Sequence, residues 1–425
     1  MHKNRLAAAC AAACLAGAMA PGIAHATDGY FQPGYSVRSV GMGGVGIALP
    51  QDALAAATNP AGMALVGNRF DAGLTIFHPD REAQIAGATY GGNDQTNFLI
   101  PEVGYNRMLN QDMSVGISLY GNGGMNSGYS RIDPRTGLLP GVGVDLQQMF
   151  ISPSFAWRVT PSNTIGVALD LVHQTFRANG LNNFASPQLS IDPTSLQAPG
   201  HDSSDGVGVR IGWIGELAPG LSVGATFQPK IHMGSFSAYR GLFADGGSFD
   251  IPANYGVGVS WQATPSWTVA ADVERILYSG VSAISNPSLP LMTLAMRQPA
   301  PRLGDPGGAG FGWGDVTVFK VGAAWKYSDA LTLRAGWNHT DNPVTSADVF
   351  FNTISPGVVK DHLTLGLTYA LSSRIDVSAD YVHAFKNSVS GYAPSMNAQG
   401  QVVGQLPETL SMTQDSVGVA IGYKF

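Results

Sequence analysis

The chain has 425 residues, a formal charge of −6 at pH 7, and 12% charged residues, which is about half the usual share of a soluble domain. An acidic chain of this kind does not suit a nucleic-acid partner. So few charges, together with 54 glycines, favour a protein whose surface contacts lipid.

The first 26 residues have the features of a cleaved secretory signal. Lys3 and Arg5 precede an uncharged run that ends at the small-residue site Ala24-His25-Ala26. A Pro-Gly pair interrupts this run and no stop-transfer segment follows, which argues against a membrane anchor. Cys10 and Cys14 would leave with the signal, so the mature chain would have no disulfide and no thiolate metal site. Its formal charge would become about −8.

Residues 27–66 form a Gly-rich segment that fits no strand pattern. Gly41–Gly46 matches G-x-G-x-x-G, but Pro50 interrupts the helix that a dinucleotide-binding turn requires. A short helix is predicted near Gln51–Ala57, and it should end before Asn59-Pro60 because a residue that precedes proline disfavours the helical region. Such a segment is suited to fill a barrel too wide for its wall side chains to close. We therefore interpret residues 27–66 as a hatch; a disordered periplasmic leader is the alternative.

Residues 67–425 repeat one pattern: alternating runs of roughly ten to fifteen residues, joined in turn by tight turns and by long polar segments. No stretch after the signal resembles a spanning helix, so entry into a membrane requires strands. A turn at His78-Pro79-Asp80 would give fifteen strands and would place a short turn outside. We therefore predict one strand over Arg69–Thr89, bent at Pro79. The predicted fold is all-β, an antiparallel transmembrane barrel of fourteen strands over residues 67–425.

Two further features favour a barrel over a soluble sandwich, in which the apolar face of each strand would pack on a second sheet. Tryptophans lie near the tight turns, as a periplasmic aromatic girdle requires: Trp157, Trp261, Trp267 and Trp325. The chain ends in an alternating strand, DSVGVAIGYKF, which would close the barrel against the first strand. A terminal Phe425 is the kind of signal that outer-membrane assembly machinery reads.

The segment GMGGVGIALPQDALAAATNPAGMA resembles the hatch of the FadL family, the outer-membrane long-chain fatty acid transporters with relatives that admit aromatic hydrocarbons. The matching positions are Gly43-Gly44, Asp52-Ala53 and the motif Asn59, Pro60, Ala61 and Gly62. The resemblance extends over the mature chain in its strand pattern. It implies a fourteen-strand barrel plugged by a hatch. Hydrophobic ligands would pass from an external groove to a lumenal pocket, then sideways into membrane lipid through a kink in the third strand.

The third strand is predicted from Met113 to about Asn122, and it continues into Gly121, Asn122, Gly123 and Gly124. Consecutive glycines weaken a strand and permit a bend, so we expect the lateral opening there. An ordinary exit from strand to loop is the alternative. Sideways release would spare the ligand an aqueous step, which costs about 0.8 kcal/mol for each methylene group.

Side-chain parity places three basic residues in the lumen, where each is a candidate to bind a fatty carboxylate: Arg210, Lys320 and Arg334. The alternative for each one is a structural ion pair with a lumenal acid such as Asp272, Glu274, Asp376 or Asp380. The loop over Ser279–Gly314 is unusually apolar for an external segment, and we expect it to contribute the ligand-capturing surface.

An enzyme and a general diffusion porin are the rival classes of function. His383 near Asp380, and His339 near Asp341, offer a base and its orienting acid. Asp380 and His383 are three apart, however, so they lie on opposite faces of a strand, and no nucleophile-elbow motif accompanies the histidines. A porin would need no hatch. We therefore expect a monomer that takes up long-chain fatty acids or aromatic hydrocarbons passively, with no catalytic residue, metal or cofactor.

Overall fold

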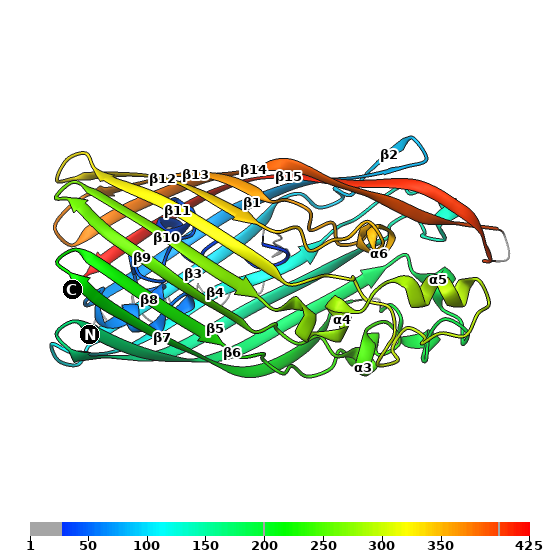
Figure 1. The fold of residues 1–425 in the computed structure, drawn as a ribbon, viewed down its shortest axis with the longest axis horizontal. Coiled ribbons are helices and arrows are strands. Elements are labelled where there is room, and N and C mark those ends of the chain that lie inside the picture. The colour runs from blue at the N-terminus through cyan, green and yellow to red at the C-terminus, as the bar shows by residue number, and fades with distance from the viewer. Residues whose placement is uncertain (1–27, 199, 398–399) are drawn as a thin grey trace, which may run out of the picture.

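The computed structural model describes residues 28–198, 200–397 and 400–425. The predicted signal, residues 1–26, lies outside the described residues. Most of the described chain forms one antiparallel sheet that closes on itself (Figure 1). Within the described ranges, no helix is long and apolar enough to span a membrane.

The barrel wall has a simple connectivity, because each strand pairs with its neighbours in chain order. The first strand, β1 (Arg69–Ile85), pairs with the last, β15 (Val402–Lys424), with Arg69 opposite Lys424. This closure leaves no edge in the ring and lets the strands satisfy one another's backbone groups in lipid. The fourteen-strand barrel is therefore confirmed. The other wall strands are β3 (Phe98–Met108), β4 (Met113–Asn126), β5 (Gly143–Thr160), β6 (Asn163–Asn179), β7 (Asp202–Ala218), β8 (Leu221–Gln228), β9 (Asn254–Thr264), β10 (Trp267–Ile276), β11 (Val316–Lys326), β12 (Leu331–Thr340), β13 (Asp361–Ala370) and β14 (Ile375–Met396).

The first strand passes through Pro79 with its alternation of buried and exposed residues intact, so the prediction of one strand across this proline is confirmed. The predicted end at Thr89 is wrong. The strand ends at Ile85, and the chain turns back through Ala86 and Gly87, which have φ values of 49° and 86°. Two central residues with positive φ make the tight turn that suits a hairpin. The returning strand, β2 (Ala88–Gly91), pairs with β1 beyond the barrel ring (Figure 1).

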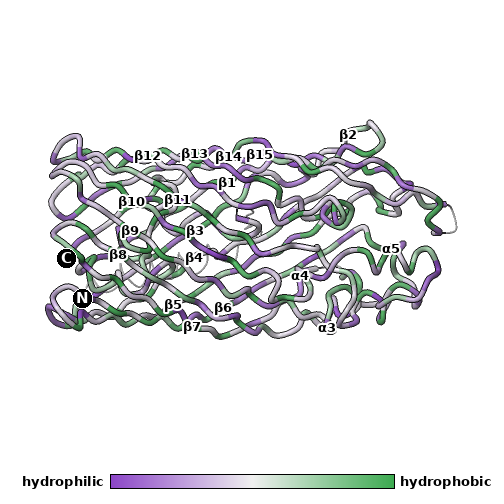
Figure 2. Tube along the Cα trace, viewed as in Figure 1, coloured by the Kyte–Doolittle hydropathy of each residue, from purple (hydrophilic) through white to green (hydrophobic). Residues whose placement is uncertain are grey.

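The outward face of the wall is apolar, because many large hydrophobic residues of the strands are exposed. Hydrophobic and hydrophilic positions alternate along the strands (Figure 2). On β13, for example, Leu363, Leu365 and Leu367 are exposed while Thr364 is buried. All described wall strands belong to one sheet, so within these ranges no second sheet covers the apolar face. The four predicted girdle tryptophans, Trp157, Trp261, Trp267 and Trp325, are all exposed. Lipid contact explains such a surface.

The short helices fall into two groups at opposite ends of the barrel (Figure 1). The amino-terminal segment holds α2 (Val37–Val40), η1 (Ala55–Ala57) and η2 (Pro60–Ala64). The long loops hold η3 (Pro134–Thr136), η4 (Asn182–Phe184), η5 (Pro193–Ser195), η6 (Ser237–Tyr239), α3 (Ala244–Gly247), η7 (Tyr278–Gly280), α4 (Ser282–Ser285), α5 (Leu289–Ala295) and α6 (Val349–Asn352).

The predicted helix over Gln51–Ala57 is wrong in extent, because only the single turn η1 forms there. Asp52 accepts a hydrogen bond from the backbone N–H of Leu54, 3.0 Å away, in a local turn that competes with a helix. Asn59 is extended before Pro60, as the proline requires.

Candidate ligand pathway

Residues 28–66 lie inside the barrel ring, near the end with the tight turns (Figure 1). In this segment α2 packs against β13, β14 and β15, while η2 packs against β5, β6 and β7. Residues such as Met42, Ala53 and Asn59 are almost wholly buried. The segment therefore contacts both sides of the wall at once.

Inward-facing carboxylates of the wall hold this segment by its backbone. An N–H group needs an acceptor wherever water is excluded, and an ionised acceptor makes the stronger bond. Asp272 accepts from Gly46 and Ile47 at 2.7 and 3.0 Å, Asp71 from Ala53 at 2.9 Å, and Glu102 from Val37 at 3.0 Å. Asp272 was predicted as a lumenal partner for a basic side chain, whereas its described hydrogen bonds are to the segment.

The motif Asn59-Pro60-Ala61-Gly62 joins the segment to the wall. The Asn59 side chain accepts from the N–H of Ala61 at 3.1 Å, which caps η2, and it donates to the main-chain oxygen of Trp213 on β7 at 3.0 Å. A Cβ added at Gly212 would overlap Asn59 Oδ1, and one at Gly166 would overlap the backbone of Ala61. Sequence reasoning missed these two wall glycines; their inward parity was the signal that could have found them.

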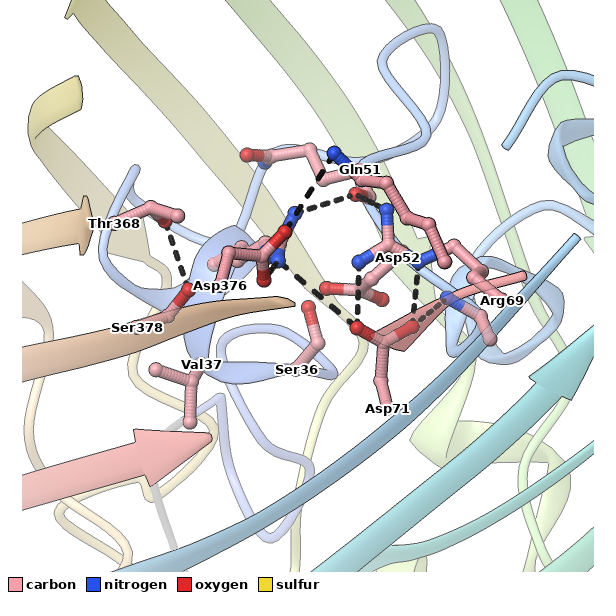
Figure 3. Close-up of polar contacts among 12 residues, drawn as sticks. Ser36, Val37, Gln51, Asp52, Arg69, Asp71, Thr368, Asp376 and Ser378 are labelled. Carbon is pink, nitrogen blue, oxygen red and sulfur yellow. Dashed lines mark hydrogen bonds and ion pairs between the residues drawn. The ribbon is translucent and has the colours of Figure 1, made fainter. Parts of the chain in front are cut away.

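A buried ionic cluster ties the segment to the place where the barrel closes (Figure 3). Arg38 of α2 pairs with Asp376 of β14, and the Arg69 guanidinium binds both oxygens of Asp71 on β1 at 2.6 Å. Arg38 and Arg69 both donate to the main-chain oxygen of Gln51 at 3.3 Å. Because β1 and β14 flank the last strand, the cluster spans the closure from the lumen side.

Asp52 lies beside this cluster. Burial raises the pKa of its carboxyl group, and the neighbouring carboxylate of Asp71 raises it further. Arg38 and Arg69 act in the opposite direction. Lys424 lies 3.6 Å from Asp376 and adds a third basic group to the cluster.

The three predicted basic residues occupy separate environments. Lys320 donates to Glu274 at 2.8 Å, so the alternative of a structural ion pair holds for it. Arg334 donates to the side chain of Gln51 at 3.1 Å and to Thr368 at 2.7 Å.

Arg210 on β7 differs from the other two, because it is 3% exposed and its described hydrogen bonds are to neutral side chains. It donates to Gln228 Oε1 at 2.5 Å and to Asn254 Oδ1 at 3.1 Å. Its Nε atom has no partner among the described residues. The buried carboxylate of Asp170 on β6 also interacts electrostatically with Arg210, and the Tyr120 hydroxyl group is a further hydrogen-bond partner.

The third wall strand, β4, leaves its neighbour part-way along. The register between β3 and β4 ends at Val103 and Leu119 among the described residues, although β4 continues to Asn126 beside β5. The register with β5 shifts between Gly121 and Gly123, which leaves Asn122 as a bulge. The predicted strand end near Asn122 is therefore too early.

The amino-terminal segment lies against this bulge. Gly124 donates to the main-chain oxygen of Tyr30 at 3.0 Å, and the N–H of Gln32 donates to that of Asn122 at 3.2 Å. A Cβ at Gly123 would overlap the Tyr30 oxygen, so the close approach requires glycine there. A cavity of about 40 Å³ lies between the segment and the wall strands β1, β3, β4, β14 and β15, and Gly121 is one of its lining residues.

A second cavity, of about 30 Å³, lies among the long loops and is almost entirely apolar. Leu291 of α5 lines it from the loop that sequence analysis singled out, together with Leu181, Phe184, Leu242, Leu303 and Phe350. At the ends of the same helix, Leu289 and Met296 are exposed. These are the side chains that a hydrophobic ligand would contact, but a cavity of about 30 Å³ is about the size of a water molecule, so a ligand would have to widen it.

The two histidines singled out in the sequence pair with other carboxylates than the ones predicted. His383 contacts Asp415 on the next strand at 2.9 Å, and His339 contacts Asp361 at 2.7 Å, rather than Asp380 and Asp341. Across the described ranges, no group of three or more His, Cys, Asp or Glu side chains is arranged to hold a metal ion.

Comparison with known proteins gives the family. The model of the family described as outer membrane protein transport protein (OMPP1/FadL/TodX) matches residues 18–425. The chain belongs to this family. A comparison with curated proteins found no match.

Solved structures resemble this FadL-family chain in fold at low sequence identity. The toluene transporter TodX of Pseudomonas putida has 20% identity and a TM-score of 0.66, with 92% of this chain and 99% of that chain covered. A FadL homologue of Pseudomonas aeruginosa has 16% identity and a TM-score of 0.70 over 93% and 99% of the chains. The toluene transporter TbuX of Ralstonia pickettii has 19% identity and a TM-score of 0.63 over 92% and 99%.

Membership of the family places this chain in the outer membrane as a transport protein for hydrophobic compounds. The FadL family consists of transport channels and not of enzymes. The resemblance drawn from the hatch segment is thus confirmed at the level of family and fold.

Proposed function

We propose that this FadL-family chain takes up long-chain fatty acids, or similar hydrophobic molecules, passively and as a monomer. The ligand is captured at the loop cavity beside α5, moves into the lumen, and leaves sideways between β3 and β4. The observation that carries this proposal is the interrupted pairing of those two strands beyond Leu119, next to a cavity.

Sideways release has a clear energetic reason. A sixteen-carbon chain moved through water would cost on the order of 12 kcal/mol, since each methylene costs about 0.8 kcal/mol. A wall that opens to lipid avoids this cost. In our proposal the backbone of Tyr30–Gln32, hydrogen-bonded to the bulge at Gly121–Gly124, must move aside for the ligand to leave.

Arg210 supports fatty acids as the ligands. Its guanidinium donates hydrogen bonds to neutral amides and its Nε atom has no partner among the described residues, so a ligand carboxylate would add a hydrogen-bonded anion to the electrostatic interaction with Asp170. We favour Arg210 over Lys320, which already pairs with Glu274, and over Arg334, which donates a hydrogen bond to Gln51. Uptake of monoaromatic hydrocarbons is the second candidate, favoured by the wholly apolar lining of the loop cavity and by the fold shared with TodX and TbuX.

The roles of the two chain ends follow from the same scheme. We propose that residues 27–66 act as the hatch, with Asn59, Pro60, Ala61 and Gly62 as the anchor to the wall. We also propose that the assembly machinery of the outer membrane reads the last strand and Phe425. The Phe425 ring stacks with Tyr105 at 5.6 Å, beside the first strand.

The test is complementation of an uptake-deficient strain with this chain, supplied with labelled palmitate or labelled toluene. Fatty acid uptake alone would support the first candidate, and toluene uptake alone would replace it with the second. Liposome swelling with sugars separates a porin, because rapid sugar entry through the intact chain would contradict a plugged transporter.

A further inference from the structure

Three buried amide side chains form a ladder that begins at the β4 bulge. Asn122, the bulge residue, donates to Gln148 Oε1 on β5 at 3.2 Å, and Gln148 donates to Gln174 Oε1 on β6 at 3.1 Å. Gln174 donates onward to Ser204 on β7 at 2.9 Å and to the main-chain oxygen of Phe249 at 2.8 Å. The three amides are at most 1% exposed. Every bond runs in the same direction away from the bulge.

The ladder is held in place by the sheet itself. Gln148 lies directly opposite Gln174 in the register of β5 with β6, and Gln174 lies opposite Ser204 in that of β6 with β7. The bulge turns Asn122 inward, where it also accepts from the Tyr35 hydroxyl group at 2.8 Å. Hydrogen bonds in an interior without water polarise one another, so the row of amide hydrogen bonds is rigid only when all of its members are present.

The bulge needs such support because the backbone of β4 next to it has no described pairing with β3. Beyond Leu119 the backbone of β4 faces β3 without a described pairing, and strands in lipid strongly favour full pairing. The amino-terminal segment satisfies part of this backbone through Tyr30 and Gln32. Once that segment moved aside, a regular β4 would pair with β3 and close the gap.

We propose that Asn122, Gln148 and Gln174 are positioning residues for lateral release, because their amide ladder fixes the bulge and keeps β4 from pairing with β3. This inference rests on the proposed sideways exit. The ladder acts on β4 from the side of β5 and β6, so its effect does not depend on which hydrophobic ligand passes.

Disulfide cross-linking reports the gap without any ligand. The register of Val103 with Leu119, extended by two residues, would place Pro101 opposite Gly121. A Cβ at Gly121 would meet Gln32 Nε2 at 3.3 Å, Ile100 Cγ2 at 3.5 Å and the Gln148 main-chain oxygen at 3.9 Å, so Gly121→Cys requires only a small shift of the Gln32 side chain. The chain's two cysteines, Cys10 and Cys14, precede the described residues and lie in the predicted signal. The starting protein for cross-linking is therefore the double variant Pro101→Cys with Gly121→Cys, to which each further substitution is added.

Adding Gln148→Leu should speed cross-linking about tenfold, roughly the effect of one lost net hydrogen bond. The control is Gln147→Leu, which removes the neighbouring glutamine of the same strand, bonded to Asp145 instead, and should change nothing. In uptake assays on the chain with native Pro101 and Gly121, Gln148→Leu should lower the saturating rate about tenfold and leave the half-saturating concentration unchanged.

Unchanged cross-linking and uptake in folded Gln148→Leu and Gln174→Leu barrels would overturn the inference. Folding is checked by the heat-dependent gel mobility of the barrel. If Gln148→Leu fails to insert, Asn122→Asp replaces it, since this variant removes the first donor at constant size. Absent uptake by the wild-type chain would refute the proposed function alone, because the cross-linking result stands without transport.

Discussion

Gly212 of β7 lies directly beneath the Asn59 side chain, so closely that a Cβ on this glycine would overlap Asn59 Oδ1. The same oxygen caps η2 through Ala61. The wall and the amino-terminal segment therefore pack so closely that residue 212 has room for a hydrogen atom but not for a side chain. This packing depends on Gly212, which lies outside the motif Asn59-Pro60-Ala61-Gly62.

Gly212→Ala should displace the motif and loosen the segment without opening the barrel. Loss of one or two buried hydrogen bonds predicts amide exchange about tenfold faster in residues 59–64. Hydrogen–deuterium exchange measures this. Gly314→Ala is the control, because an added Cβ there meets nothing within 4 Å. Equal exchange in the two variants would show that the close approach is unimportant.

Arg210→Met should weaken fatty acid uptake and leave toluene uptake unchanged, because only the carboxylate uses the charge. A hydrogen bond to a charged group is worth about 1.5–3 kcal/mol, which predicts a half-saturating palmitate concentration roughly tenfold to a hundredfold higher. Lys320→Met is the comparison, since Lys320 already pairs with Glu274. A larger palmitate defect in Lys320→Met than in Arg210→Met would reassign the carboxylate site.

Leu291→Ser should impair capture. Leu291 is 4% exposed and lines the loop cavity, so its loss removes apolar contact worth about 1.5–3 kcal/mol when a ligand is bound. We expect a half-saturating ligand concentration at least about tenfold higher, with the saturating rate retained. Gln298→Asp, at an exposed position just after α5, should behave as wild type. An unchanged half-saturating concentration in Leu291→Ser would show that the ligand is captured elsewhere.

The raised pKa of Asp52 predicts that the stability of the amino-terminal segment depends on pH. A carboxyl group whose folded-state pKa is raised stabilises the fold most below its unfolded pKa of about 3.9, and this contribution declines as the pH rises towards the folded value. Residues 51–57 should therefore exchange amide hydrogens faster at about pH 7 than at about pH 4, after correction for intrinsic rates.

Asp52→Asn keeps the acceptor for Leu54 and removes the titrating group, so it should abolish most of that pH difference. Asp112→Asn, in an exposed turn, serves as the control. A pH difference that survives in Asp52→Asn would assign it to another group of the cluster.

Much of the wall could be predicted from the sequence, because the parity of a strand is a local property. Alternation alone identified the outward face of β13 and the girdle tryptophans, and the rule of short and long connections identified one strand across Pro79. The end of that strand was missed, since Ala86 is not a residue type that announces a turn with positive φ.

The partners of the inward-facing residues depended on how the ring closes. Parity placed Asp272 and Arg210 in the lumen, but the sequence does not show that Asp272 accepts a hydrogen bond from Gly46 or that Arg210 donates one to Gln228. Contacts such as Gly212 with Asn59 join residues far apart in the chain, and their geometry exists only once strands and segment are packed together.

The sequence by itself determined export, family resemblance and a barrel with an apolar exterior, because these depend on composition and on period-two alternation. Only the tertiary structure decided where β4 leaves β3 and that Asn122 faces Gln148. A single bulge shifts the register of every residue beyond it. No local sequence pattern shows where a strand stops pairing with one of its neighbours.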